Sequence, residues 1–487
     1  MTLDRHNPTD NAANEITAEE GASGRRSSSR LELLTVAHAA ALLVFSTWAF
    51  GGETDAAHLL IRWWGLPAVI LTVLATWRRL QKREGLPPLL RWLWPLLLLD
   101  GLVLLSCLNP SLVRTTVRGA QVFVQHHPDS PWLSSARPDL SLRELWLFNA
   151  IYLTAFNVAI IVRRRRMLRA LLLIATANTL VLAVFGTFQK LAHASGLFFG
   201  VQRSPNPAFF ASFIYHNHWG ALSLLSTAAA LALLFHYSRL RESGGRRHSP
   251  TLFGLTATLL MAASVPLSTS RSCSVMLLLL LAGALFHWLR RIHRHARAGG
   301  RSPAVPAAIA VGAFLVGIVA IYLLGEPVIE ARVDKTREQI EQIKLHGGLG
   351  GREQLYGDTW RMAREKIWFG WGLESYATVF QTFNQQVSVE GWVPFYAQAH
   401  SDWLQALAEL GVAGTALVLL LGAVPLAALR RTGPTGALPG CLLAGCGLIA
   451  LYAWVEFPFA NPAVMLTFWL CFFTAIRYAQ LDAHART

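Results

Sequence analysis

The sequence has 487 residues, of which 53% are hydrophobic and 15% are charged, and its formal net charge is +15 at pH 7. Soluble globular domains carry about 25% charged residues, so this deficit, with repeated apolar runs of membrane-spanning length, excludes a soluble class. The runs are continuous, not alternating, and therefore predict helices. Much of the positive charge lies in short loops, where it sets membrane topology instead of indicating a nucleic-acid ligand.

The chain begins with a polar segment, residues 1–30, which carries Arg25, Arg26 and Arg30 just before the first apolar run. No signal-peptide cleavage pattern follows a short apolar core. We therefore expect an uncleaved cytoplasmic tail.

Twelve apolar segments follow, each near the ~20 residues that a helix needs to cross a bilayer. They are 31–50, 59–77, 88–107, 144–162, 170–192, 218–237, 251–268, 272–289, 304–324, 403–427, 437–456 and 463–480. Every even-numbered segment up to the tenth is followed by a basic loop, such as Arg163–Arg166. By the positive-inside rule these loops are cytoplasmic, and both termini lie on the same side.

The opposite, extracytoplasmic side receives loops 108–143 and 193–217, a tight turn at 268–272, a long polar loop at 325–402, and 457–462. Within the long loop, Glu330–Lys344 and Arg352–Trp368 have helical composition, with a glycine-rich break at 347–351 between them. Gly370-Trp371-Gly372 then leads into a short helix near Glu374–Phe383.

The predicted fold is an all-α polytopic membrane protein with one large helical loop. Its parts are a tail (1–30), nine spans (31–324), the extracytoplasmic loop (325–402), three spans (403–480) and a cytoplasmic tail (481–487). No Walker loop, dinucleotide fingerprint or kinase motif is present, which disfavours ATP-driven transport by this chain alone. The cysteines are spaced for neither a disulfide framework nor a zinc site and are expected to be small core residues. They are Cys107, Cys273, Cys441, Cys446 and Cys471.

Several arginines fall on the extracytoplasmic side, against the general charge bias. They are Arg203, Arg271, Arg352, Arg361 and Arg364. A planar guanidinium suits phosphate oxygens, although a headgroup contact or an ion pair is the alternative for each. A functional role is favoured most for Arg271, because the turn at 268–272 is too short to let this side chain move away from the membrane surface.

His400 comes just before the tenth span and is a candidate base, because imidazole changes charge near neutral pH. Asp402 or Glu409 can orient it, while a purely structural histidine remains the alternative. His216 and His218 are two residues apart, a spacing that points them to different sides of a helix, so substrate contact or helix capping is favoured over a metal. Glu456 is costly in lipid unless it pairs, and an arginine of the site is the expected partner.

Four separated blocks, within roughly residues 200–465, carry a resemblance to a known family. They are Phe213-Ile214-Tyr215-His216-Asn217-His218-Trp219-Gly220, Ser268-Thr269-Ser270-Arg271-Ser272, Arg352…Tyr356…Asp358…Trp360 through Gly370-Trp371-Gly372…Tyr376, and His400-Ser401-Asp402-Trp403-Leu404…Glu409-Leu410-Gly411-Val412-Ala413-Gly414. They resemble the motifs of the O-antigen ligase and polymerase family of membrane glycosyltransferases, with Glu456…Pro458…Pro462 similar to a late acidic-proline element. Tyr215, Ser272 and Tyr356 depart from residues common in the family and blur the subfamily.

The resemblance implies a glycosyltransferase C-like enzyme of the bacterial inner membrane that needs no cofactor and no metal. It implies inverting transfer of a glycan from undecaprenyl diphosphate to an acceptor hydroxyl at the periplasmic face, with lipid A-core as the acceptor of a ligase. In this interpretation His400 is the base, and Arg271 and Arg352 bind the diphosphate. Further substrate-binding residues are Arg203, Arg361, Asn217, His218, Asp402, Tyr356 and Glu456.

Three alternatives stay open. A polymerase shares these motifs and differs in its acceptor, a second lipid-linked glycan. A transporter of lipid-linked glycans or small solutes needs polar groups or broken helices at mid-membrane, and the spans here are mostly clean. The third is a structural scaffold of a polysaccharide assembly complex.

Overall fold

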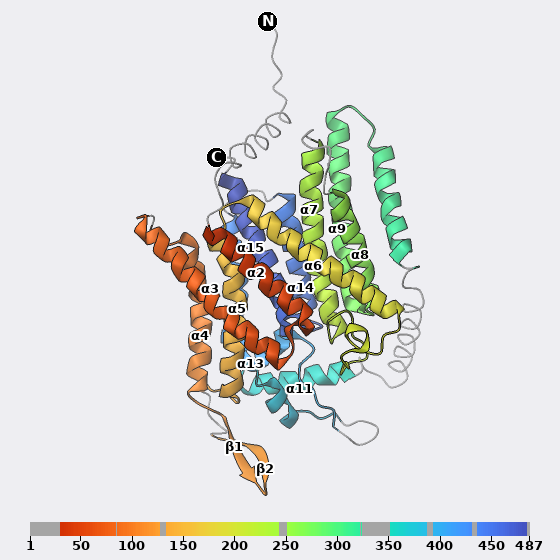
Figure 1. Cartoon of the computed structure of the whole chain (residues 1–487). Coiled ribbons are helices and arrows are strands. Elements are labelled where there is room, and N and C mark those ends of the chain that lie inside the picture. Colours follow the sequence, from red (N-terminus) through yellow and green to blue (C-terminus); the bar gives the residue numbers. More distant parts are fainter. Residues whose placement is uncertain are drawn as a thin grey trace.

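The computed structural model describes residues 30–83, 85–126, 133–242, 251–321, 323, 351–386, 393–430 and 436–484. The expected tail before Arg30 and the expected helix Glu330–Lys344 lie outside the described residues. Figure 1 shows a bundle of long helices with a smaller layer across one end.

Within the described residues the long helices follow the predicted apolar segments. They are α2 (Arg30–Trp48), α3 (Asp55–Gln81), α4 (Trp94–Cys107), α5 (Pro138–Ile161), α6 (Arg165–Leu191), α7 (His216–Glu242), α8 (Thr251–Leu267), α9 (Arg271–Ala298), an unlabelled helix Ala304–Ile321, α13 (Asp402–Leu429), α14 (Ala437–Tyr452) and α15 (Pro462–His484). Ten of these helices are long and apolar enough to cross a membrane, α4 being counted together with the 3₁₀ turn η2 (Pro88–Leu93), and α8 and α14 are shorter apolar helices. The chain is therefore an all-α, multi-pass membrane protein.

Helices α5, α7 and α15 form the centre of the bundle. Between 78% and 94% of their apolar windows is buried inside the protein, against 17% for α9 and none for Ala304–Ile321. The rings of Tyr152 and Phe156 on α5 pack edge-on against Phe473 of α15 at 5.4 Å between centroids. Aromatic packing thus joins α5 to α15 at the centre of the bundle.

The loop 108–143 contains a β-hairpin that the helical interpretation did not include. Strands β1 (Leu112–Val117) and β2 (Ala120–Gln125) pair antiparallel, and Val113 lies opposite Val124. Arg118 and Gly119 both have positive φ, 50° and 82°, as a two-residue hairpin turn requires. The β-branched residues on either side of this turn favour strands. The hairpin projects from the same end of the bundle as α11 (Figure 1).

The described part of the long loop forms the layer across this end of the bundle. It contains α11 (Gly351–Glu365), α12 (Tyr376–Val379) and the 3₁₀ turn η4 (Phe380–Thr382). Figure 1 shows α11 lying across the direction of the long helices. Its buried apolar side packs with Trp371, Tyr376 and Phe380 in a small core separate from the main one.

Two glycine motifs attach this layer to α13. Gly411 interrupts the helix with φ 63° and ψ −171°, which frees backbone groups on both sides of it. Four hydrogen bonds of 2.8–3.1 Å use them: Trp371 N to Ala408 O, Gly372 N to Glu409 O, Val412 N to Ile367 O, and Ala413 N to Trp368 O. These bonds join the chain around Gly370-Trp371-Gly372 to the chain around Glu409-Leu410-Gly411. We call this junction the glycine lock, and it positions the loop over the membrane helices.

Candidate functional site

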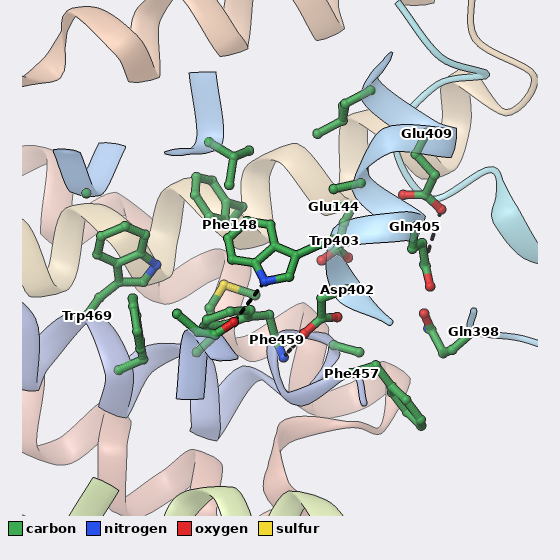
Figure 2. Close-up of a pocket in the computed structure, with 18 of the residues that line it drawn as sticks. Glu144, Phe148, Gln398, Asp402, Trp403, Gln405, Glu409, Phe457, Phe459 and Trp469 are labelled. Carbon is green, nitrogen blue, oxygen red and sulfur yellow. Dashed lines mark hydrogen bonds between the residues drawn. The ribbon is translucent and has the colours of Figure 1, made fainter. Parts of the chain in front are cut away.

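A cavity of about 1090 Å³ lies between the loop layer and the membrane helices. Its polar half contains ionisable and amide side chains from several distant segments. These include Glu53, His58, Glu144, Tyr215, His218, Gln398, His400, Asp402, Gln405 and Glu409. Figure 2 shows part of this half, with Gln398, Gln405 and Glu409 at one side and the aromatic residues Phe457 and Phe459 below Asp402.

The other half of the cavity is apolar and follows α13 away from His400. It is lined by Val418, Leu419, Leu426, Leu443, Phe468, Trp469 and Phe472. On α13 the apolar lining beyond the Gly411 interruption runs from Val418 to Leu426, a rise of roughly 12 Å at 1.5 Å per residue. A bilayer hydrocarbon core is about 30 Å thick. The cavity thus joins a polar chamber to an apolar groove that extends along α13 toward the middle of the membrane helices.

His400 stands where the loop meets α13. It has φ 53°, a left-handed conformation that is uncommon for a residue other than glycine. Its Nδ1 is buried and lies 3.7 Å from Oε2 of Glu456, while 27% of the side chain stays exposed. The exposed edge of the imidazole is therefore the one away from Glu456.

Glu456 lies in the loop between α14 and α15 and is almost fully buried. Arg352, in the first turn of α11, forms an ion pair with its Oε1 and donates from the other terminal nitrogen to Val455 O at 3.0 Å. Burial alone would raise the pKa of Glu456, but the neighbouring His400 and the charge of Arg352 outweigh it and hold that pKa below its ordinary value. Glu456 is therefore a carboxylate, and its expected pairing with an arginine is found.

A chain of hydrogen bonds connects this carboxylate to the turn that carries Arg271. Tyr215 donates to Oε2 of Glu456 at 3.3 Å, and Asn217 Nδ2 donates to the Tyr215 hydroxyl at 2.7 Å. Ser270 Oγ then donates to Asn217 Oδ1 at 2.6 Å. Arg271 follows Ser270 directly, as the exposed first residue of α9. Two motifs that are separate in the sequence thus belong to one network.

Phe457 is the aromatic centre of the site. Its ring stacks on Tyr215 at 5.3 Å between centroids and meets His400 and His218 edge-on at 4.8 and 5.1 Å. Because His400 is far from Tyr215 and His218 in the sequence, this one ring sets the spacing between the two segments. Sequence reasoning did not select Phe457, although it directly follows Glu456.

His218 lines the cavity, and protein atoms occupy both of its ring nitrogens. Nδ1 pairs with Glu53, in the turn between α2 and α3, and Nε2 lies 3.2 Å from Phe457 O. Asn461 donates to the same Glu53 oxygen at 2.8 Å. Glu53 was missed from the sequence, because nothing local marks a residue whose partners are hundreds of positions away.

The carboxylates expected to orient His400 have other partners. Asp402 Oδ2 accepts from Phe459 N at 2.9 Å, and Glu409 accepts from the backbone of Glu374 and Tyr376, each at 3.0 Å. The left-handed turn at His400 separates its backbone direction from that of α13. The carboxylate that lies nearest to its ring is therefore Glu456, and the suggestion of Asp402 or Glu409 is corrected.

The remaining predicted residues divide into two groups. Tyr356 belongs to the site, since its hydroxyl donates to His400 O at 2.9 Å. Arg361 instead pairs with Asp358 and donates to Phe383 O at 3.1 Å, within the loop layer. Arg203 is exposed in a loop three residues before Asn206, which lines the cavity. The geometry thus brings Arg352, and not Arg361, to His400.

Residues 256–419 match the family model described as O-antigen ligase. This segment is an O-antigen ligase family domain. No curated protein matches the chain.

The O-antigen ligase family domain runs from α8 into α13. It contains Arg271, Arg352 and His400, whereas Tyr215 and Glu456 lie outside it. The site therefore combines residues of the family domain with Tyr215, which precedes the domain, and Glu456, which follows it. Membership supports a glycosyltransferase-type ligase or polymerase role in a membrane.

Proposed function

We propose that this protein transfers a glycan from undecaprenyl diphosphate to an acceptor hydroxyl at the periplasmic face of the bacterial inner membrane, most closely as an O-antigen ligase with a lipid A-core acceptor. The observation that carries the proposal is the two-part cavity. A polar chamber lined by His400, whose ring faces the Arg352–Glu456 pair, continues into an apolar groove along α13. A lipid-linked donor has the same two parts, a charged head and a long hydrocarbon tail.

The arginines take the role of charge neutralisation. Arg352 is half-exposed, and two of its three nitrogens are engaged by Glu456 and Val455. In the proposal it binds the diphosphate together with Arg271, with Arg203 nearer the rim. Charge-assisted bonds of this kind stabilise a leaving diphosphate without requiring a metal.

His400 takes the role of general base. Glu456 faces Nδ1, so Nε2 accepts the proton of the acceptor hydroxyl. The acceptor oxygen then attacks the anomeric carbon of the donor sugar, and the bond from that carbon to the diphosphate oxygen breaks. Attack on the face opposite the leaving group inverts the anomeric centre. Undecaprenyl diphosphate leaves with the electron pair, and the arginines hold its charge.

The test compares purified wild type with His400→Ala, using a labelled undecaprenyl-diphosphate glycan and EDTA. Wild type should transfer label in EDTA, and the variant should lose nearly all of it. Transfer that EDTA abolishes would sink the arginine mechanism. Offering lipid A-core and a second lipid-linked glycan in parallel separates the two acceptors: label only on the second would make the protein a polymerase.

A further inference from the structure

A second groove of about 640 Å³ lies on the helix pair α3–α5, apart from the main cavity. Three charged side chains and four apolar ones line it. They are Asp55, Arg62, Arg143, Leu59, Trp63, Leu66 and Trp146. Two guanidinium groups against one carboxylate give the lining a net positive charge.

The apolar part of this groove continues along α3 as a lipid-facing stripe. Six side chains of this stripe recur at helical spacing, and each is at least 44% exposed. They are Leu59, Trp63, Leu66, Ile70, Val73 and Trp77. Arg62 and Arg143 lie at one end of the stripe, in the first half of α3 and of α5. Arginine and tryptophan together at the end of a lipid-facing stripe are typical of the headgroup level of a bilayer.

The arginines of the groove are available for a ligand. Arg62 is held in place, because its Nε donates to His58 O at 3.2 Å and Trp146 Nε1 donates to its carbonyl at 2.9 Å. Within the described part of the chain, the terminal nitrogens of Arg62 and the guanidinium of Arg143 have no hydrogen bond or ion pair. A guanidinium so placed suits a phosphate, which accepts two bonds from its fork.

We propose that this groove seats the acceptor substrate as a phosphate-bearing lipid, with its acyl chains on the α3 stripe and its phosphate on Arg62 and Arg143. The inference rests on the proposed function, which requires two lipid-anchored substrates. The main cavity has one apolar groove for one tail. Both lipid A-core and a second lipid-linked glycan carry phosphate, so the groove serves either acceptor.

The groove lies beside the polar chamber of the main cavity, because α3 and α5 supply residues to the lining of both. His58, whose carbonyl holds Arg62, lines the main cavity, and so does Glu144, the neighbour of Arg143. His58 and Arg62 are four residues apart on α3, a spacing at which side chains are about 5–6 Å from each other. A lipid whose phosphate is bound in the groove therefore has its glycan next to the polar chamber.

The kinetic test uses the full protein in nanodiscs of zwitterionic lipid, with donor saturating and acceptor titrated. In Arg62→Gln/Arg143→Gln the acceptor concentration for half-maximal rate should rise roughly tenfold for each arginine–phosphate interaction that the substitutions remove. Donor KM and the rate at saturating acceptor should stay at wild-type values. Arg114→Gln/Arg118→Gln, on the exposed hairpin, is the matched control and should behave as wild type. An unchanged acceptor response, or a change confined to the donor KM, would overturn the inference.

A binding measurement keeps the inference testable without turnover. Native mass spectrometry should detect retention of bis-phosphorylated lipid A by wild type and by His400→Ala, but weaker retention by the double arginine variant. Dephosphorylated lipid A should bind poorly to all three. If wild type retains phosphorylated lipid A in this way but transfers no glycan, the groove is a phospholipid-type binding site and the proposed transferase function is wrong. Equal competition by phosphatidylglycerol would assign the groove to ordinary membrane lipid and overturn the acceptor role.

Discussion

Arg352 and Glu456 form an ion pair that joins the extramembrane layer to the membrane helices. They are 104 residues apart in the chain, one in α11 and the other between α14 and α15. The second oxygen of Glu456 faces His400 and accepts from Tyr215. One buried carboxylate thus orients the proposed base and anchors the proposed diphosphate-binding arginine, so changes around it test both roles.

Replacing this carboxylate should impair turnover far more than folding. In Glu456→Gln, His400 loses the charge facing Nδ1, and we expect kcat to fall about 100-fold, as for loss of an oriented general base. Stability should change by about 1 kcal/mol, because the half-exposed Arg352 can be hydrated. Glu365→Gln, at the exposed end of α11, is the control. Initial rates and thermal unfolding measure both effects, and equal losses in the two variants would contradict the role of Glu456.

The ion pair between Arg352 and Glu456 also predicts how the free energy of unfolding depends on pH. The folded pKa of Glu456 lies below its ordinary value of 4.5, so the folded state favours the charged form. The contribution of this carboxylate to the free energy of unfolding is fully present above pH 4.5, its ordinary pKa. It is lost as the pH falls through the lower pKa that Glu456 has in the folded protein. The difference in melting temperature between wild type and Glu456→Gln should therefore be constant near neutrality and shrink below about pH 4.5. A difference that grew on acidification would contradict the pairing.

The glycine lock should be sensitive to one methyl group. A Cβ on Gly411 would lie 2.4 Å from Phe369 N, and its φ of 63° is itself unfavourable for alanine. We expect Gly411→Ala to cost at least about 2 kcal/mol, with the loop layer loosened first. Hydrogen exchange at Trp371 and Val412 amides should accelerate. Gly283→Ala, a helical position with open space around it, should be neutral or slightly stabilising.

Hydropathy predicted the helices well, because it is a local property of the sequence. The segment expected at 170–192 corresponds to α6 at Arg165–Leu191, and the turn expected at 268–272 falls between α8 and α9. The hairpin β1–β2 was missed because the loop 108–143 was interpreted only as a connection between two membrane helices. Its alternating valines and Arg118-Gly119 turn were nevertheless readable signals.

Pairings within the site were harder to predict than its members. His400, Arg352 and Glu456 were all selected from the sequence, and an arginine was expected beside Glu456. Which carboxylate faces His400 depended on a left-handed turn and a contact between distant loops, and neither has a local signature. The pairing of Glu53 with His218 across 165 residues is of the same kind. Motifs thus identify reactive groups, while their partners come from packing.

The hydrogen-bond chain through Tyr215 gives the last prediction. Burial raises the pKa of Tyr215, and Glu456 raises it further, so the hydroxyl keeps its proton at neutral pH and donates to that carboxylate. Tyr215→Phe removes this bond and leaves Asn217 without its acceptor. Because a hydrogen bond to a charged group contributes about 1.5–3 kcal/mol, kcat should fall at least about tenfold while the donor KM stays near its wild-type value. Tyr396→Phe, which removes a hydroxyl that donates to Gln386 in the loop layer, should retain activity. An effect of Tyr215→Phe on KM alone would mean that Tyr215 contacts substrate directly instead of holding Glu456 toward His400.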